Sequence, residues 1–273
     1  MAWAMKAHIL AADWLGGSLH VLAVTAAGLV DLRWRDAIDW TVLDGRYCVG
    51  RIGRDGHAPC PLGATVGHEA QCAACAPSWS ACVFEPVLHG PGDACTLCQR
   101  DHAVYLAMYG TLPKVGMTSA ARVETRLREQ GADAYFVIQT RRDRLAARQT
   151  ERTVSTLYGV PERRRHHEIL RLLTRPLDHD LVRSRATAWQ QRLAERYDCG
   201  PLRFLDHSLP VLPLRPHRVE VEGQHVGMAL GAKGDHLFYR ATGAIALPET
   251  GPPVHALQRS ALPGRMVEVA AVR

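Results

Sequence analysis

Seven of the eight cysteines lie between residues 44 and 101, and this clustering constrains the fold more than any other feature of the chain. The same segment is rich in Gly and Pro and shows little hydrophobic periodicity. A segment of this kind buries too little apolar surface to fold by itself. We therefore expect a bound metal ion or cross-links to hold it together.

The clearest metal-binding pattern consists of two Cys-x2-Cys pairs. Cys72-x2-Cys75 and Cys95-x2-Cys98 are separated by 19 residues, a spacing typical of a zinc site with four cysteine ligands. Two other interpretations of these cysteines are less favoured. Disulfides are disfavoured in the cytoplasm. A redox-active Cys-x2-Cys pair would follow a strand and open a helix, and that context is not present here. The sequence predicts one structural zinc ion on these four thiolates. Such a site is closed, so its expected role is folding, not catalysis.

The remaining cysteines of the segment leave a second zinc site open. Three thiolates and one histidine complete a tetrahedral site, although unligated thiols also pack as small hydrophobic groups. Cys199 stands apart from the others and is predicted to be a core residue. The candidate ligands of the second ion are Cys48, Cys60, Cys82 and His102, and His57, His68 and His89 lie in the same stretch.

Composition and charge narrow the class of protein. With 47% hydrophobic and 22% charged residues the chain is globular, and no apolar run approaches the ~18 residues of a membrane span. The N-terminus lacks the features of a secretory signal, so we expect a cytoplasmic protein. The net charge is +6, and residues 122–196 contain 17 arginines against 10 acidic residues. Arginine pairs well with phosphate, which favours a nucleic-acid partner over a merely solvated basic surface.

After the cysteine-rich segment, hydrophobic periodicity predicts regular structure, with Gly131 placed to end a helix. Residues 6–34 are predicted to form a hairpin around Gly16-Gly17, and the chain after Gly200 is predicted to be strand-rich up to residues 266–269. The predicted elements between them are strands at 103–108, 114–117 and 134–138, and helices at 119–130, 142–157, from Pro161 onward, and at 181–197.

Three short motifs follow one another in this central region: Val104-Tyr105-Leu106, Lys114-Val115-Gly116-Met117-Thr118 and Arg126-Leu127-x-x-Gln130. Together they resemble the GIY-YIG nuclease core. In that family two hairpin strands carry the name-giving tripeptides, the next helix supplies an arginine, and a later helix supplies a metal-binding glutamate. The resemblance implies a divalent-metal-dependent endonuclease.

Carried over by position, the resemblance implies catalytic roles for Tyr105, Lys114, Arg126 and Glu151. Tyr105, or water relayed through it, would accept a proton from the attacking water, and Arg126 would stabilise charge on the phosphoryl oxygens. Glu151 would hold Mg²⁺ or Mn²⁺. Lys114 stands where the family has its second tyrosine, and we expect it to contact phosphate instead.

Structural roles remain open for the same residues, because Tyr105 lies on an apolar strand and Arg122 and Arg126 are spaced to pair with Glu124 or Glu129. The candidate substrate-binding residues are Thr118, Arg122, Arg148, Arg163, Arg164 and Arg165.

The chain is also similar to an uncharacterised zinc-containing family, a domain of unknown function. The similarity covers most of the chain and implies that a lysine at position 114 is a family trait. The matching pieces are the cysteine region, Cys98-x-x-x-His102-x-Val104-Tyr105, Lys114-Val115-Gly116-x-Thr118, Thr125-Arg126-x-x-x-Gln130-Gly131-Ala132 and Gly231-x-Lys233-Gly234.

The predicted fold is α+β, in four segments. They are an N-terminal β segment (1–43), a Cys-rich zinc-binding module (44–101), a GIY-YIG-like core with a small antiparallel sheet and basic helices (102–198), and a C-terminal β-rich segment (199–273). The predicted function is endonucleolytic hydrolysis of DNA or RNA. The alternatives are a non-catalytic, zinc-containing nucleic-acid-binding protein, and an enzyme that reuses the cleft on a nucleotide or transfer-RNA substrate in a biosynthetic pathway.

Overall fold

The structure, a computed structural model, divides the chain into two compact units. Unit 1 comprises Met1–Ala76 and Ser208–Arg273, and unit 2 comprises Pro77–His207. The fold class is α+β, as the sequence predicts. The described residues are 5–15, 18–34, 36–53, 56–77, 96–207, 209, 216–242 and 252–270.

Unit 1 is built on one large sheet with the strand order β11-β14-β13-β12-β4-β15-β1-β2-β3, and β5 and β6 form a separate hairpin. Its core contains Trp34, Trp40 and Tyr239, and the Trp34 ring packs edge to face against the other two. The strands are β1 (Met5–Leu15), β2 (Ser18–Thr25), β3 (Gly28–Asp31), β4 (Ala37–Val42), β5 (Arg51–Gly53), β6 (Gly56–Ala58), β11 (His217–Arg218), β12 (Gly223–Lys233), β13 (His236–Ala241), β14 (Val254–Gln258) and β15 (Met266–Val269), with a short 3₁₀ turn η2 at Arg259–Ala261.

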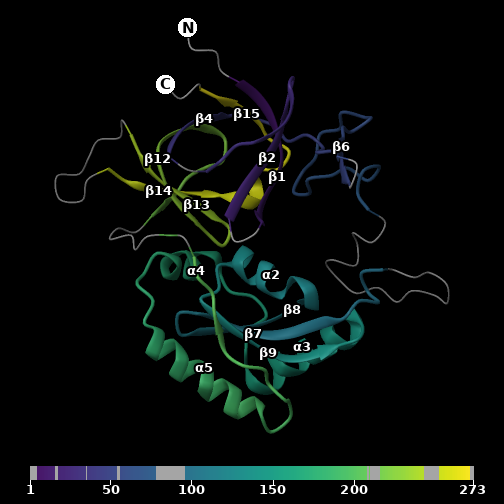
Figure 1. Ribbon diagram of the computed structural model, residues 1–273, viewed down its shortest axis with the longest axis vertical. Coiled ribbons are helices and arrows are strands. Elements are labelled where there is room, and N and C mark those ends of the chain that lie inside the picture. Colours follow the sequence, from purple (N-terminus) through teal and green to yellow (C-terminus); the bar gives the residue numbers. More distant parts are fainter. Residues whose placement is uncertain are drawn as a thin grey trace. The chain divides into compact units, whose positions relative to one another are not determined.

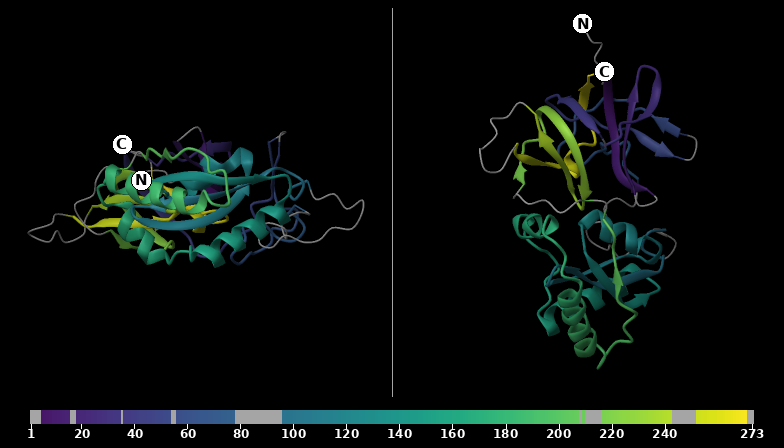
Figure 2. Two further views of the ribbon diagram at one scale, coloured as in Figure 1. Left: turned by 90° about the horizontal axis from the view of Figure 1, so that it is seen from below. Right: turned by 60° about the vertical axis from the view of Figure 1, so that its left-hand side comes forward.

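The two ends of the chain share this sheet. β15 pairs with both β1 and β4, and β12 pairs with β4. Strands drawn in purple and in yellow, from opposite ends of the sequence, therefore lie side by side in Figures 1 and 2. The N-terminal and C-terminal β segments, which the sequence predicts as separate segments, therefore share a common core.

Unit 2 has a four-stranded sheet in the order β10-β9-β7-β8, with helices on both faces. All eight residues of β7, which pairs with both β8 and β9, are buried because both faces of the sheet are covered. The elements are β7 (His102–Tyr109), β8 (Leu112–Ser119), η1 (Ala120–Arg122), α2 (Val123–Gln130), β9 (Ala134–Arg141), α3 (Arg144–Tyr158), α4 (His166–Leu173), α5 (His179–Leu193) and β10 (Arg203–Phe204).

The alternation of side chains along β7 divides the interior of unit 2 into two cores. Val104, Leu106 and Met108 face α3 and α5, whereas Tyr105 and Tyr109 face α2 and α4. This three-layer arrangement can be followed in Figure 1. It places the tyrosines of β7 on the same side as the arginine-bearing helix α2.

Local signals account for the helix ends. The Asp143 carboxylate caps α3 by accepting from the Ala146 backbone N–H at 2.7 Å, and Gly131 ends α2 with φ 75°. The helix predicted from Pro161 instead begins at His166. The residues before it run along β8, where the Pro161 carbonyl accepts from the Val115 backbone N–H at 3.1 Å. That segment therefore covers a sheet edge, a use of the chain that helical periodicity does not reveal.

Among the described residues, no helix combines the length and apolar character needed to cross a membrane.

Candidate functional sites

Four cysteines of unit 1 form a compact sulfur cluster. The Sγ atoms of Cys48, Cys60, Cys72 and Cys75 all lie within 4.8 Å of one another, and those of Cys60 and Cys72 are 3.8 Å apart. A tetrahedral zinc ion with Zn–S bonds of about 2.3 Å requires sulfurs about 3.8 Å apart. The described cysteines form no disulfide. We call this group the four-cysteine cluster; its geometry fits a zinc ion.

The β5–β6 hairpin brings the first two sulfurs together, because Cys48 and Cys60 flank its base. Gly50 makes this approach possible: it has φ 73°, and a Cβ there would lie 2.2 Å from the Ala58 carbonyl oxygen. Cys72 and Cys75 lie in a tight turn closed by the Cys75 backbone N–H on the Cys72 carbonyl at 3.0 Å. The turn and the hairpin base therefore supply two sulfurs each.

The surroundings of the four-cysteine cluster favour thiolates at some positions. The Cys48 sulfur accepts backbone N–H groups from Gly50 at 3.4 Å and Cys72 at 3.2 Å. Hydrogen bonding from the Ala64 backbone N–H lowers the pKa of Cys60, whereas burial raises the pKa of Cys75. Thiolates packed this closely repel one another, and a bound dication removes the repulsion.

This grouping differs from the predicted ligand sets. Cys72 and Cys75 lie with Cys48 and Cys60, and among the described residues Cys98 is not part of this group. Cys48 and Cys60, which the sequence suggested as ligands of a second ion, therefore lie with Cys72 and Cys75 in the four-cysteine cluster. Cys82, His89 and Cys95 lie outside the described residues.

The other sequence candidates near the four-cysteine cluster have different surroundings. The His57 ring donates from Nε2 to the Val49 carbonyl at 2.7 Å, and His68 is exposed. His102 is buried at the start of β7 in unit 2, and Cys98 lies just before that strand. Cys199 packs against the core of unit 2, as predicted.

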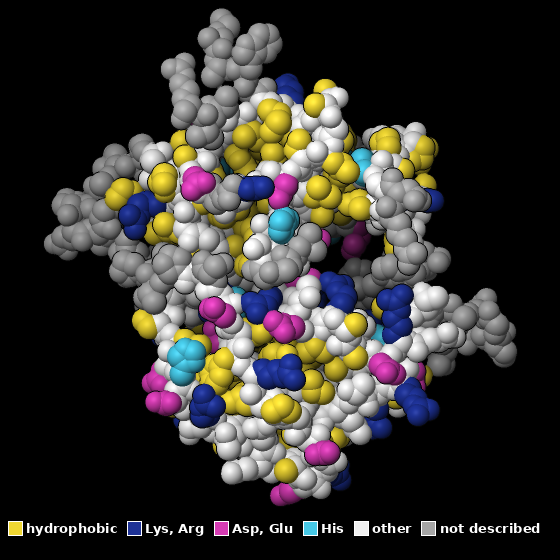
Figure 3. Space-filling model, viewed as in Figure 1, with side chains coloured by type: hydrophobic (Ala, Val, Ile, Leu, Met, Phe, Trp, Pro, Cys, Tyr) yellow, Lys and Arg dark blue, Asp and Glu magenta, His cyan; other side chains and the backbone are white. Residues whose placement is uncertain are grey.

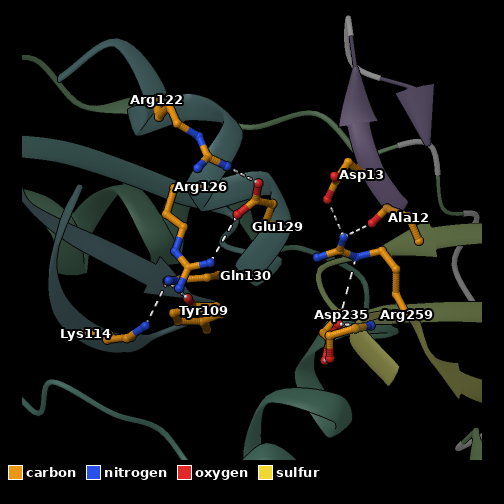
Figure 4. A network of polar contacts seen from close by, with 11 residues as sticks. Ala12, Asp13, Tyr109, Lys114, Arg122, Arg126, Glu129, Gln130, Asp235 and Arg259 are labelled. Atoms are coloured by element: carbon orange, nitrogen blue, oxygen red, sulfur yellow. Dashed lines mark hydrogen bonds and ion pairs between the residues drawn. The ribbon is translucent and has the colours of Figure 1, made fainter. Parts of the chain in front are cut away.

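A second set of residues forms a polar cluster in unit 2, which we define as Tyr105, Tyr109, Lys114, Arg126 and Gln130. Lys114 Nζ donates to Gln130 Oε1 at 2.8 Å, and the Tyr109 hydroxyl donates to the same oxygen at 3.1 Å. Figure 4 shows the Arg126 side chain beside this contact. β7, β8 and α2 each contribute to the polar cluster.

Gly116 allows this packing. It is paired with Tyr105 across the hairpin, and a Cβ at Gly116 would lie 2.7 Å from the Tyr105 hydroxyl oxygen. The tyrosine ring therefore occupies the space that any other residue at position 116 would fill.

Burial shifts the titration of the groups in and beside the polar cluster. It raises the pKa of Tyr105 to about 12 and raises the pKa of Glu151. Burial, assisted by the positive charge of Arg126, lowers the pKa of Lys114 to about 8. Glu151 interacts electrostatically with both Tyr105 and Lys114, so α3 contributes a carboxylate to the same region.

Several of the predicted phosphate-binding arginines form ion pairs with carboxylates. Glu129 accepts from Arg122 at 2.7 Å and from Arg126 at 3.1 Å, although these arginine side chains remain 60% and 48% exposed. Arg148 lies 2.7 Å from both Glu151 and Glu162. Glu129 is only 8% exposed, so moving Arg122 and Arg126 onto a phosphate would leave a buried carboxylate without these two cations, and the exchange would carry a cost.

The three consecutive arginines have different surroundings. Arg164 donates to the Pro113 carbonyl at 2.6 and 3.0 Å, which commits it to holding β8. Arg163 and Arg165 are both exposed, and the charge of Arg163 reaches Lys114. Thr118 lies on β8, paired with Ala103.

Two members of the polar cluster received no role in the sequence analysis. Gln130 stood within a matched motif, and Tyr109 follows Tyr105 by four residues, which places both on one face of β7. That spacing was the available signal for Tyr109. The acceptor role of Gln130 depends on the register of β8 against α2, which periodicity does not specify.

Residues 60–242 match the family described as "Protein of unknown function (DUF2797)". The match spans more than half of the chain, and the chain belongs to this family. No curated protein and no solved structure matched the chain.

Proposed function

We propose that this DUF2797 protein is a zinc-stabilised, GIY-YIG-like endonuclease that hydrolyses phosphodiester bonds in DNA or RNA at the polar cluster of unit 2. One arrangement carries the proposal: Lys114 of β8 contacts Gln130 beside Arg126 of α2, and the Tyr105 hydroxyl of β7 lies over Gly116. Glu151 of α3 interacts electrostatically with both Tyr105 and Lys114. The order hairpin, helix, strand, helix, with β7 between β8 and β9, agrees with the nuclease core.

The residues suggest a division of roles. Arg126 is half exposed, so its guanidinium can bind the phosphoryl oxygens and stabilise the charge that develops there. Tyr105 keeps its proton near neutral pH because its pKa is about 12. Lys114 is the better proton acceptor, since its pKa of about 8 leaves a fraction of neutral amine near neutrality. Tyr105 would then donate a hydrogen bond to the attacking water or to the phosphate.

The residues near Glu151 provide a partial fit to Mg²⁺ or Mn²⁺. Glu151 and Glu162 both accept from one nitrogen of Arg148 at 2.7 Å, so two carboxylates already converge on a cationic group. Glu151 would hold the ion, and its carboxylate would first have to separate from Arg148. Such an ion neutralises charge on the phosphate when bound.

The Arg148–Glu151 pair also favours a second candidate function, nucleic-acid binding without hydrolysis. The Arg148 guanidinium neutralises Glu151, the carboxylate that interacts with both Tyr105 and Lys114. This neutralisation opposes metal binding at Glu151. On the face drawn in Figure 3, Lys and Arg side chains alternate with Asp and Glu instead of forming one basic patch. Binding by this route would rest on a few exposed arginines, such as Arg122 and Arg165.

Labelled DNA and RNA panels, incubated with and without Mg²⁺ or Mn²⁺, separate these functions. The endonuclease proposal expects metal-dependent cleavage that Glu151→Gln abolishes and that Lys114→Met lowers by about 10²–10⁴-fold. The matched control is Glu124→Gln on α2, because Glu124 is exposed and pairs with Arg128. Salt-sensitive binding without cleavage would support the second candidate, and neither binding nor cleavage would refute both.

A further inference from the structure

His102 has a buried nitrogen atom with no assigned partner. The side chain is 0% exposed, and its Nδ1 lies 2.7 Å from the Arg100 carbonyl oxygen. A carbonyl only accepts, so Nδ1 carries the ring proton and Nε2 presents a bare lone pair. Within the described residues, Nε2 has no hydrogen-bond partner. An unsatisfied buried acceptor is costly, so a ligand for Nε2 is expected.

Cys98 is held next to the N-terminus of α3. Its carbonyl accepts from the Arg144 backbone N–H at 2.9 Å, at the first turn of α3. His102 interacts electrostatically with Asp143 and Arg144, the N-cap and first residue of that helix. Cys98 and His102 therefore both lie near the start of α3. In the sequence, Cys98 also closes a Cys-x2-Cys pair, a spacing at which thiolates grip one metal ion.

From this arrangement we propose that Cys98 and His102 bind a second zinc ion in unit 2, distinct from the ion of the four-cysteine cluster. Zinc-bound histidines commonly donate their other ring N–H to a carbonyl, as His102 does to Arg100. A thiolate and a neutral imidazole are each ligands that zinc accepts. The inference is independent of the proposed nuclease activity.

The expected role of this ion is structural. It would join the residues just before β7 to the start of β7, near the N-terminus of α3, the helix that carries Glu151. Because zinc binding of this kind contributes to folding, its loss should loosen the N-terminal end of β7 first.

Zinc content and X-ray absorption of the full-length protein test the proposal. The wild type should contain about two zinc ions per chain, with both sulfur and nitrogen scatterers. His102→Gln should lose about one zinc ion and also the nitrogen scattering signal. Cys60→Ser should lose about one zinc ion but retain the nitrogen scattering signal. The control, His179→Gln, changes an exposed histidine of the same unit at the start of α5, and should leave the zinc content unchanged.

Two results would overturn the proposal: wild-type protein with about one zinc ion surrounded by sulfur alone, or a folded His102→Gln variant with unchanged zinc and nitrogen scattering. The wild-type measurement decides even if His102→Gln does not fold. His102→Cys provides a further check, because it should keep the ion and replace the nitrogen scatterer by sulfur.

Discussion

Replacing Gly116 by alanine should destabilise unit 2 by crowding Tyr105. The added Cβ would lie 2.7 Å from the tyrosine hydroxyl oxygen and 2.8 Å from Cζ, whereas carbon atoms prefer separations of about 3.5–4.0 Å. The ring is only 1% exposed and packs in the core beneath α2, so it has little room to move. Overpacking of this kind costs about 1–3 kcal/mol.

This cost should lower the unfolding midpoint of unit 2 by roughly 3–10 °C. Hydrogen exchange measured by mass spectrometry is the suitable assay, because it reports on the amides of β7 and β8 separately from those of unit 1. The control is Gly200→Ala, where the nearest atom to the new Cβ is the Val137 carbonyl oxygen at an ordinary 3.5 Å. Its stability should change by less than about 0.5 kcal/mol.

The Tyr105→Phe background provides an internal check. It removes the closest oxygen but leaves the ring carbon, so part of the Gly116→Ala penalty should disappear, and the two changes should not be additive. Protection of β7 and β8 in Gly116→Ala equal to that of the wild type would show that Tyr105 is not held against Gly116.

Three further predictions follow from the sites. Cys60→Ser should release the ion of the four-cysteine cluster and expose the β5–β6 hairpin to protease; unchanged zinc content would contradict the cluster assignment. Because burial lowers the pKa of Lys114 from 10.5 to about 8, the unfolded chain binds more protons between these values. The stability of unit 2 should therefore rise with pH across that range in urea unfolding, and Lys114→Met should remove the gain. Arg148→Gln should tighten Mn²⁺ binding measured by electron paramagnetic resonance, since it frees Glu151; wild-type affinity would argue against a metal there, and Arg152→Gln is the control on the same helix.

Much of unit 2 was predictable from the sequence because its signals are local. The strands around Tyr105 and Gly116 and the helix that ends at Gly131 follow from residues close together in the chain. Asp143 specifies the start of α3 in the same way. Capping and alternation act over a few residues, so the order of elements needs no knowledge of the tertiary structure.

Which cysteines cluster together was not predictable from the sequence, because the grouping depends on how the loops between them fold. The Cys-x2-Cys spacing suggested that Cys72 and Cys75 would join the second such pair. In the structure, the β5–β6 hairpin lies between Cys48 and Cys60 and brings their sulfurs close to those of Cys72 and Cys75. Closing a longer loop costs little extra entropy, so spacing in the sequence ranks the possible partners only weakly.

By itself, the sequence determined a cysteine-rich region suited to binding a metal ion, an α+β chain, and the residue types of the polar cluster. Only the tertiary structure decided that β15 and β12 join β4, and that Lys114 shares an acceptor with Tyr109. Each of these depends on contacts between residues far apart in the chain or on the register of one element against another. Such contacts are selected by the packing of the whole unit, and no local pattern encodes them.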